Sequence, residues 1–288
     1  MKVLITGAGG LVGSALLPLF GPDDEVHALV RAPAPALQRR NTRVHVLDLA
    51  GPIDTSALPR TLDAVVYLAQ SENFRAFPEQ ARDIFDVNVA SLLRLLDHAR
   101  YVGARTFVIA SSGGVHGTSS GPVRDDTAVA ATGRHGFYLS TKLCGEILGE
   151  AFAPHMDVAM LRLFFAYGRG QRRNMLVPRL VDSVRDGRPV VLQGEQGIRI
   201  NPIHAADAAA ACHAALGLTG CNKVNVAGPE VLSLRELCEM IGDRVERRPI
   251  FDVREGSAEA DLVADLSAMA RLLGVPRRRI ADHLNEML

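Results

Sequence analysis

Tyr138 and Lys142 are the two residues of this chain whose types and spacing point most directly to chemistry. They stand four residues apart in residues 138–152, whose apolar pattern predicts a helix, so both side chains project from one helix face. An ammonium beside a phenol favours the phenolate and lowers the tyrosine pKa from about 10 toward neutral pH. The pair is therefore a candidate acid and base for moving a proton on or off a hydroxyl group. An accidental pair on an amphipathic helix is the weaker alternative, because the chain has only four tyrosines and three lysines.

Ser112 is a third candidate, 26 residues before Tyr138 and just beyond the apolar run 106–110, which predicts a strand. In an open parallel sheet, residues past the carboxyl ends of strands face the ligand crevice. The serine hydroxyl could there share a substrate oxygen with the tyrosine. A loop serine that hydrogen-bonds its own backbone is an equally good interpretation of Ser112 taken alone.

The first fourteen residues predict the element that would hold a cofactor beside these groups. A β-branched run at 3–5 predicts a buried strand, and an apolar pattern from Leu11 predicts a helix. Gly7, Gly10 and Gly13 lie between and within them, which permits a tight turn, close approach of phosphates, and close helix–strand packing. A glycine-containing turn without a ligand is the weaker alternative, because this stretch opens a βαβ pattern.

Strands and helices alternate along the following residues. We expect strands at 25–30, 44–47, 64–68, 106–110 and 158–164, and helices at 79–102 and 138–152. This alternation predicts an α/β fold with a Rossmann-type, doubly wound parallel sheet.

Shorter elements follow residue 168 and predict a small C-terminal lobe. We expect residues 1–168 to form the dinucleotide-binding domain and residues 169–288 to be mostly a substrate-binding lobe, with a segment near 201–226 returning to the sheet. Ser233 and Glu236 have the spacing of a helix capping box, and residues 266–288 predict helix with a break at Pro276.

Composition excludes several classes of protein. The formal net charge is zero, which gives no electrostatic reason to expect a nucleic-acid or membrane partner. We see no apolar run long enough to cross a bilayer and no signal peptide, and we expect a cytoplasmic protein. The four cysteines are scattered without zinc spacing, so we expect reduced thiols and no metal site.

Several motifs occur in a fixed order along nearly the whole chain. They are TGAGGLVG at 6–13, Asn88, ASSGGVHG at 110–117, YLSTK at 138–142, and later blocks at 161–168, 201–207 and 263–274. With these motifs the chain resembles the extended short-chain dehydrogenase/reductase family, in particular its NAD(P)-dependent nucleotide-sugar epimerase/dehydratase branch.

The resemblance implies a role for each candidate. Tyr138 would remove a hydroxyl proton while the adjacent carbon gives hydride to a nicotinamide, and Ser112 would hydrogen-bond the same oxygen. Lys142 would lower the tyrosine pKa and hold the nicotinamide ribose. The implied cofactor-binding residues are Gly7, Gly10, Leu11, Val12, Gly13, Arg31, Asp48, Leu49, Leu68, Ala69, Asn88, Tyr138 and Lys142.

The end of the second strand bears on the choice of cofactor. NAD-using relatives usually place an aspartate there, whereas this chain has Val30 followed by Arg31. A guanidinium can bind a 2′-phosphate, so we favour NADP, with NAD as the other possibility. Alternatively, Arg31 stacks on the adenine, whose edge Asp48 and Leu49 hold.

The substrate side departs from the family pattern. Gly113 and Gly114 replace the acidic pair of the family's dehydratases, which disfavours dehydration. Phe165 stands where the family usually has an asparagine, and Arg199 is the nearest phosphate-clamping arginine, one residue out of register. We expect a nucleotide sugar, and the substrate-binding candidates are Ser71, Gly113, Phe165, Arg199 and His204.

Three functions remain open at this point. The first is a sugar epimerase, and the second is an NADP-dependent reductase or dehydrogenase of a sugar or another small hydroxy or keto compound. A cofactor sensor without catalysis ranks last, because it has no use for Ser112, Tyr138 and Lys142 together. The resemblance also implies a homodimer formed through helices 79–102 and 138–152.

Overall fold

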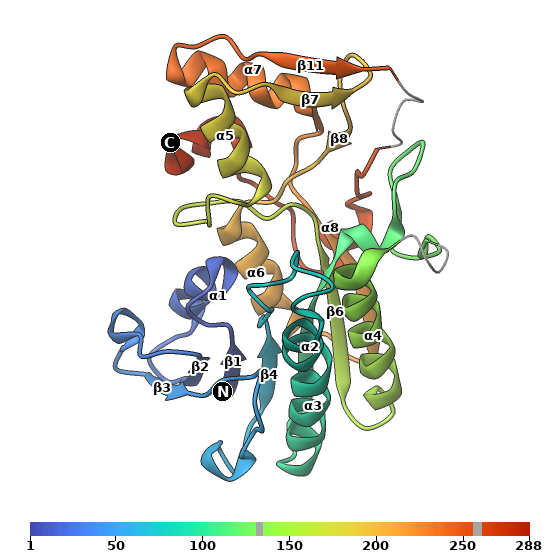
Figure 1. The fold of residues 1–288 in the computed structure, drawn as a ribbon. Helices are drawn as coiled ribbons and strands as arrows, with labels where there is room; N and C mark the ends of the chain where they lie inside the picture. The colour runs from blue at the N-terminus through green and yellow to red at the C-terminus, as the bar shows by residue number, and fades with distance from the viewer. Residues whose placement is uncertain (131–134, 256–260) are drawn as a thin grey trace.

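A seven-stranded parallel sheet forms the centre of the computed structural model, which describes residues 1–130, 135–255 and 261–288 (Figure 1). The strand order is β3-β2-β1-β4-β5-β6-β9, and every neighbouring pair is parallel. The strands are β1 (Lys2–Thr6), β2 (Glu25–Val30), β3 (Thr42–Val46), β4 (Ala64–Tyr67), β5 (Thr106–Ser112), β6 (Asp157–Leu163) and β9 (Cys221–Val226). Their apolar runs suit a sheet that is covered on both faces. The prediction of a doubly wound α/β fold is confirmed.

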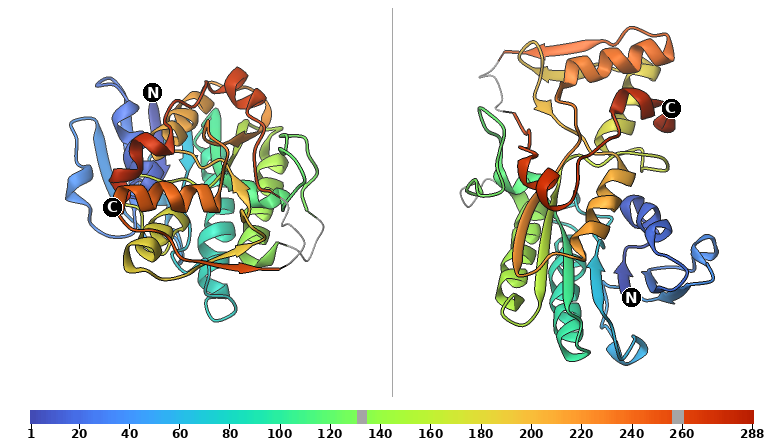
Figure 2. Two further views of the ribbon diagram at one scale, coloured as in Figure 1. Left: turned by 90° about the horizontal axis from the view of Figure 1, so that it is seen from above. Right: turned by 180° about the vertical axis from the view of Figure 1, so that it is seen from behind.

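Helices cover both faces of this sheet (Figure 2). On one face α1 (Leu11–Leu16) packs against α6 (Ala205–Ala215), and α8 (Ser267–Leu272) adds Met269 to the same apolar core. The other face carries α2 (Ala81–Phe85), α3 (Ser91–Tyr101) and α4 (Gly136–Phe152). The central strands are thereby buried, and loops surround the carboxyl ends of the strands, where an open parallel sheet binds its ligand.

A smaller layer lies beyond the carboxyl ends of the strands, at the top of Figure 1. It contains α5 (Leu176–Asp186), α7 (Leu234–Val245), α9 (Ile280–His283) and the parallel pair β7 (Val190–Gln193) and β11 (Phe251–Arg254). The short strands β8 (Arg199–Ile200) and β10 (Leu232–Ser233) form an antiparallel pair. These elements bury a separate apolar core.

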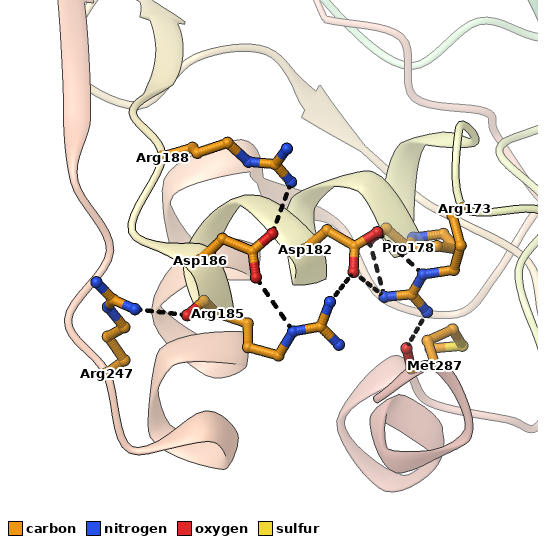
Figure 3. A network of polar contacts seen from close by, with 8 residues as sticks. All are labelled: Arg173, Pro178, Asp182, Arg185, Asp186, Arg188, Arg247 and Met287. Atoms are coloured by element: carbon orange, nitrogen blue, oxygen red, sulfur yellow. Dashed lines mark hydrogen bonds and ion pairs between the residues drawn. The ribbon is translucent and has the colours of Figure 1, made fainter.

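A polar network ties α5 to the C-terminal residues of this layer (Figure 3). Asp182 accepts hydrogen bonds from Arg173 and Arg185, and Arg173 Nη1 also donates to the carbonyl of Met287 at 2.6 Å. Arg247 Nη1 donates to the Arg185 carbonyl at 2.6 Å. The network holds α5 in place, and α5 follows directly after the segment that borders the cofactor groove described below.

Several elements differ from their predicted bounds. The helix predicted at 79–102 begins at Ala81 and contains a π-helical turn, Asp86–Ala90, between α2 and α3. The third strand starts two residues earlier than predicted, at Thr42. Between α8 and α9, seven residues around Pro276 are not helical, which agrees with the predicted break. The capping box is present, because Ser233 Oγ accepts from the Glu236 amide and Glu236 accepts from the Ser233 amide.

Residues near 201–226 contribute to the large sheet, as β9 pairs with β6 and α6 packs on α1. No helix in the described part of the chain has the length and apolar character needed to cross a membrane.

Candidate active site

A groove of about 480 Å³ runs past the carboxyl ends of β1, β2 and β4. The glycine-rich turn after β1 forms its floor, and the segment after β6 closes its far side. Its lining includes Gly7, Gly9, Gly10, Leu11, Val30, Arg31, Asp48, Leu49, Leu68, Ala69, Gln70, Ser71, Glu72, Phe74, Gly170, Gln171, Arg172 and Met175. Nine of the residues expected to bind cofactor or substrate therefore border one cavity.

The glycine turn has the shape that a dinucleotide requires. Gly7 has a φ of +65°, a left-handed conformation that suits glycine. At Gly13, a Cβ would lie 2.4 Å from the Gly7 carbonyl oxygen and 2.7 Å from Ala8 Cα, so only glycine lets α1 pack this closely on the turn. Backbone rather than side chains thus faces the groove, as close approach to a pyrophosphate demands. The residues present fit a nicotinamide dinucleotide.

A second cavity, of about 490 Å³, contains the candidate catalytic groups. Tyr138 and Ser112 both line it, together with Arg75, His135 and several aromatic and aliphatic side chains: Phe74, Phe77, Phe137, Leu139, Leu163, Phe164, Phe165 and Leu262. Phe74 borders both cavities, so the two spaces adjoin one another. Tyr138 and Ser112 thus lie in a cavity that is next to the cofactor groove.

The hydroxyl of Tyr138 donates to Gln70 Oε1 at 2.9 Å. Burial raises the pKa of Tyr138, while hydrogen bonding by Ser112 and the charge of Arg75 act in the opposite direction. This differs from the expectation that Lys142 would lower the tyrosine pKa, since burial outweighs the groups that act to lower it. The neutral phenol is favoured because burial disfavours the charged phenolate.

Lys142 is buried beneath Tyr138 on the same helix. Its Nζ lies 5.8 Å from the centre of the Tyr138 ring and donates to the Ala110 carbonyl at 3.1 Å. Burial lowers the pKa of Lys142 to about 8. The ammonium is thus held at the carboxyl end of β5, where it can lose its charge at mildly alkaline pH.

Ser112 closes β5 and caps the short helical turn that follows, since its Oγ accepts from the Gly114 amide at 3.2 Å. The local-backbone interpretation of this serine is therefore correct, but it does not displace the other, because Ser112 also lines the cavity that contains Tyr138. Gly113 beside it packs against the Phe164 ring, which a Cβ would overlap at 2.3 Å.

Asn88 lies in the π-helical turn and is buried. Its Oδ1 accepts from the Ser71 amide at 3.0 Å, and its Nδ2 donates to Thr141 Oγ1 at 2.9 Å. It thereby joins the loop after β4 to the catalytic helix α4. Asn88 does not border the cofactor groove itself, so its contact with a cofactor stays a prediction.

The remaining predicted residues fall into two groups. Val12 is part of α1 and packs against the apolar core, and Phe165 lines the catalytic cavity with a φ of +43°, an uncommon conformation for a bulky residue. Arg199 and His204 border neither cavity. Arg199 forms an ion pair with Asp261 at 2.5 Å, and His204 caps α6 and contacts Glu286 at 3.1 Å.

Sequence reasoning named Leu68, Ala69 and Ser71 in the loop that follows β4 but missed four of their neighbours. Gln70 binds the tyrosine hydroxyl, Glu72 lines the cofactor groove, and Phe74 and Arg75 line the catalytic cavity. Their position just past the carboxyl end of a central strand was the available signal. The side-chain directions that bring them to the two cavities depend on the path of the loop.

Comparison with known proteins shows which family this chain belongs to. Residues 3–227 match the model of the NAD dependent epimerase/dehydratase family. The chain belongs to this family. Family membership agrees with the resemblance drawn from the glycine turn, the serine motif and the tyrosine–lysine pair, and it makes the protein an NAD-dependent epimerase or oxidoreductase in type.

Individual members of the family are similar over almost the full chain. The uncharacterized UDP-glucose epimerase YtcB of Bacillus subtilis is 26% identical over 95% of this chain and 92% of its own length. A dTDP-4-dehydro-6-deoxy-D-allose reductase from Streptomyces sp is 26% identical over 99% of this chain and 94% of its own length. The solved structure of MoeE5 in complex with UDP-glucuronic acid and NAD is 26% identical, with a TM-score of 0.83 over 99% of this chain and 97% of that one.

These comparisons also bear on the expected cofactor. The similar solved structure holds NAD, and none of the proteins named above supports the preference for NADP that Val30 and Arg31 indicated. In the structure Arg31 already has a charged partner, because its Nη2 is 2.9 Å from Glu72 Oε1. A guanidinium that is already paired with a carboxylate is a poor receptor for a 2′-phosphate.

Proposed function

We propose that this protein is an NAD-dependent epimerase that acts on a nucleotide sugar. The observation that carries the proposal is the junction of two cavities, one lined by the glycine turn and the other by Tyr138 and Ser112. The names of its relatives support the substrate class, since YtcB is described as a UDP-glucose epimerase and MoeE5 binds UDP-glucuronic acid or UDP-glucose.

In the proposed mechanism Tyr138 first loses its own proton to solvent, and the resulting phenolate accepts the proton of a sugar hydroxyl while Ser112 hydrogen-bonds the same oxygen. Gln70 releases the phenol when substrate enters, because its amide oxygen occupies the place of the incoming group. Lys142, buried behind the tyrosine, stabilises the phenolate as it forms. The nicotinamide, when bound, supplies a reversible hydride acceptor, so the chain itself needs to provide only orientation and proton transfer.

In this proposal the N-terminal and C-terminal parts of the chain bind different ligands. Residues 1–168 bind the dinucleotide together with the groove border at 170–175, and the rest of residues 169–288 mostly bind the substrate, apart from the segment that joins the large sheet. Arg199 and His204 retain no direct part in this proposal, because each is engaged in a contact away from both cavities.

We propose NAD rather than NADP as the cofactor. The bound NAD of MoeE5 supports it, and so does the ion pair between Arg31 and Glu72. Asp48 and Leu49 remain in position to contact the adenine, as they line the same groove.

We further propose a homodimer that uses α3 and α4. Phe85, Leu93 and Ile147 are 45%, 44% and 56% exposed and supply apolar surface on α2, α3 and α4. Size-exclusion chromatography with light scattering tests this, and a monomeric mass at micromolar concentration would contradict it.

A nucleotide-sugar reductase is the second candidate, and the similarity to the dTDP-4-dehydro-6-deoxy-D-allose reductase favours it. The two activities separate in one assay. The protein is incubated with NAD and UDP-glucose, UDP-glucuronic acid or a dTDP-linked 4-keto-6-deoxysugar, and the sugars are analysed by NMR.

An epimerase converts its sugar to an epimer with no net change in the absorbance of reduced nicotinamide. Stoichiometric oxidation of added NADH with a keto sugar identifies a reductase instead. Failure of every sugar to react or to bind would contradict the nucleotide-sugar assignment.

A further inference from the structure

Glu72 lies between two arginines that reach it from different parts of the chain. Its Oε1 is 2.9 Å from Arg31 Nη2, and it also accepts a hydrogen bond from Arg172 Nη2. Arg31 follows the end of β2, and Arg172 belongs to the segment after β6. Glu72 itself stands in the loop after β4, so the three charges come from three separate elements.

All three residues line the cofactor groove. Their side chains are partly exposed, with 60% for Arg31, 54% for Arg172 and 40% for Glu72. Partial burial acts to raise the pKa of Glu72, but the two arginines outweigh it and hold this pKa below its ordinary value. The carboxylate is therefore charged at neutral pH and forms ion pairs with Arg31 and Arg172.

NAD and NADP differ only in the 2′-phosphate, a dianionic group on the adenosine ribose. Arginine near the end of β2 is a natural receptor for that phosphate, because its planar fork binds two phosphate oxygens at once. Here Val30 and Ala32 flank Arg31, so no carboxylate follows β2 directly. The carboxylate that pairs with Arg31 is instead that of Glu72, more than forty residues later in the chain.

We propose that Glu72 determines dinucleotide specificity, making the groove select NAD over NADP by engaging Arg31 and Arg172 and by repelling a 2′-phosphate. The inference rests on the proposed use of NAD and adds the residue responsible. A carboxylate supplied by the β4 loop performs the selection that a residue at the end of β2 would otherwise make.

The test measures binding of NAD and NADP to the full-length protein by isothermal titration calorimetry. Glu72→Gln keeps the size of the side chain and removes its charge. We expect the ratio of NADP to NAD affinity to rise by about tenfold or more, the size of one charge-assisted hydrogen bond. Glu79→Gln is the matched control, because Glu79 is exposed and does not line the groove, and its ratio should stay at the wild-type value.

A second variant assigns the effect to the arginine. In Glu72→Gln combined with Arg31→Ala, the gain in NADP affinity should disappear. Glu72→Asp retains the charge and should keep the preference for NAD. An unchanged ratio in Glu72→Gln, or an equal loss of both affinities, overturns the proposal.

The measurement needs no turnover and no sugar. If the protein proves to be a reductase rather than an epimerase, the ratio still reports on Glu72. If wild-type protein binds NADP better than NAD, the proposed cofactor fails, and that result is seen before any variant is compared.

Discussion

Glu146 and Arg162 form a two-pronged ion pair in the interior of the protein. Arg162 Nε donates to Glu146 Oε1 at 2.9 Å and Nη2 donates to Oε2 at 2.8 Å, with both side chains at most 2% exposed. Ser111 Oγ donates to the same carboxylate at 2.5 Å. Because Glu146 is one turn beyond Lys142 on α4 and Arg162 is in β6, the pair fixes the catalytic helix to the sheet.

Glu146→Gln should destabilise the fold strongly. The substitution leaves the Arg162 guanidinium buried without its counter-charge, which costs about 3–5 kcal/mol. Urea unfolding at pH 7 measures the loss. Glu150→Gln is the control on the same helix, where the ion pair with Lys223 is half-exposed and the loss should stay below about 1 kcal/mol. Equal losses in the two variants would show that the buried pair does not anchor α4.

Tyr138→Phe should abolish turnover while NAD binding persists. The substitution removes the hydroxyl that faces Ser112 and Gln70, and loss of a general acid or base lowers the rate by about 10²–10⁴. Turnover is measured with whichever sugar the wild type accepts, and NAD binding by calorimetry. Tyr101→Phe, at a tyrosine that is 83% exposed, should leave the rate unchanged. Turnover at the wild-type rate in Tyr138→Phe would refute the proposed mechanism.

The buried Lys142 should make stability depend on pH. Its pKa is about 8 in the folded protein against an ordinary value of 10.5, so the unfolded chain binds the proton more tightly. The contribution of Lys142 to the free energy of unfolding is therefore most favourable above the pKa of this lysine in the unfolded chain. That contribution is lost as pH falls through about 8, the pKa in the folded protein. Relative to Lys142→Met, wild-type stability should rise by about 2 kcal/mol between about pH 7.5 and pH 10.

Urea unfolding across that pH range measures the Lys142 effect. Lys2→Met serves as control, because the Lys2 side chain is 32% exposed, and its difference from wild type should vary far less with pH. A difference between wild type and Lys142→Met that is flat with pH would mean that the lysine is not held in a dry site.

Gly13→Ala should disrupt the cofactor groove, and Gly9→Ala should not. At Gly13 the added methyl meets backbone atoms of Gly7 and Ala8 within 2.7 Å, and these cannot move without opening the turn. At Gly9 the nearest atoms are side-chain carbons of Leu37 and Val30 at 3.7 and 3.9 Å.

We expect Gly13→Ala to lose about 1–3 kcal/mol of stability and most NAD affinity, as overpacking does in a tight site. Thermal unfolding and calorimetry measure the two effects. If both alanine variants bind NAD equally well, the close approach of α1 to the turn is not what shapes the groove.

The local secondary structure of the chain could be predicted from its sequence alone. The apolar β-branched runs, the glycine spacing after β1 and the capping box at Ser233 each act over a few residues, and each appears in the structure where its pattern lies. The family motifs predicted the fold for the same reason: each motif is a short pattern of strand, turn or helix residues, and the motifs follow one another in a fixed order.

Contacts between distant segments were decided only by the tertiary structure. Arg31 in isolation indicated a phosphate receptor, and its meaning changed because the fold carries Glu72 across the groove to it. The sequence likewise paired Tyr138 with Lys142 by helical spacing, yet Gln70, which binds the tyrosine hydroxyl, lies 68 residues away on another loop. Residue types and short spacings determine which chemistry is available, whereas charge pairing and burial depend on neighbours that only the folded chain brings together.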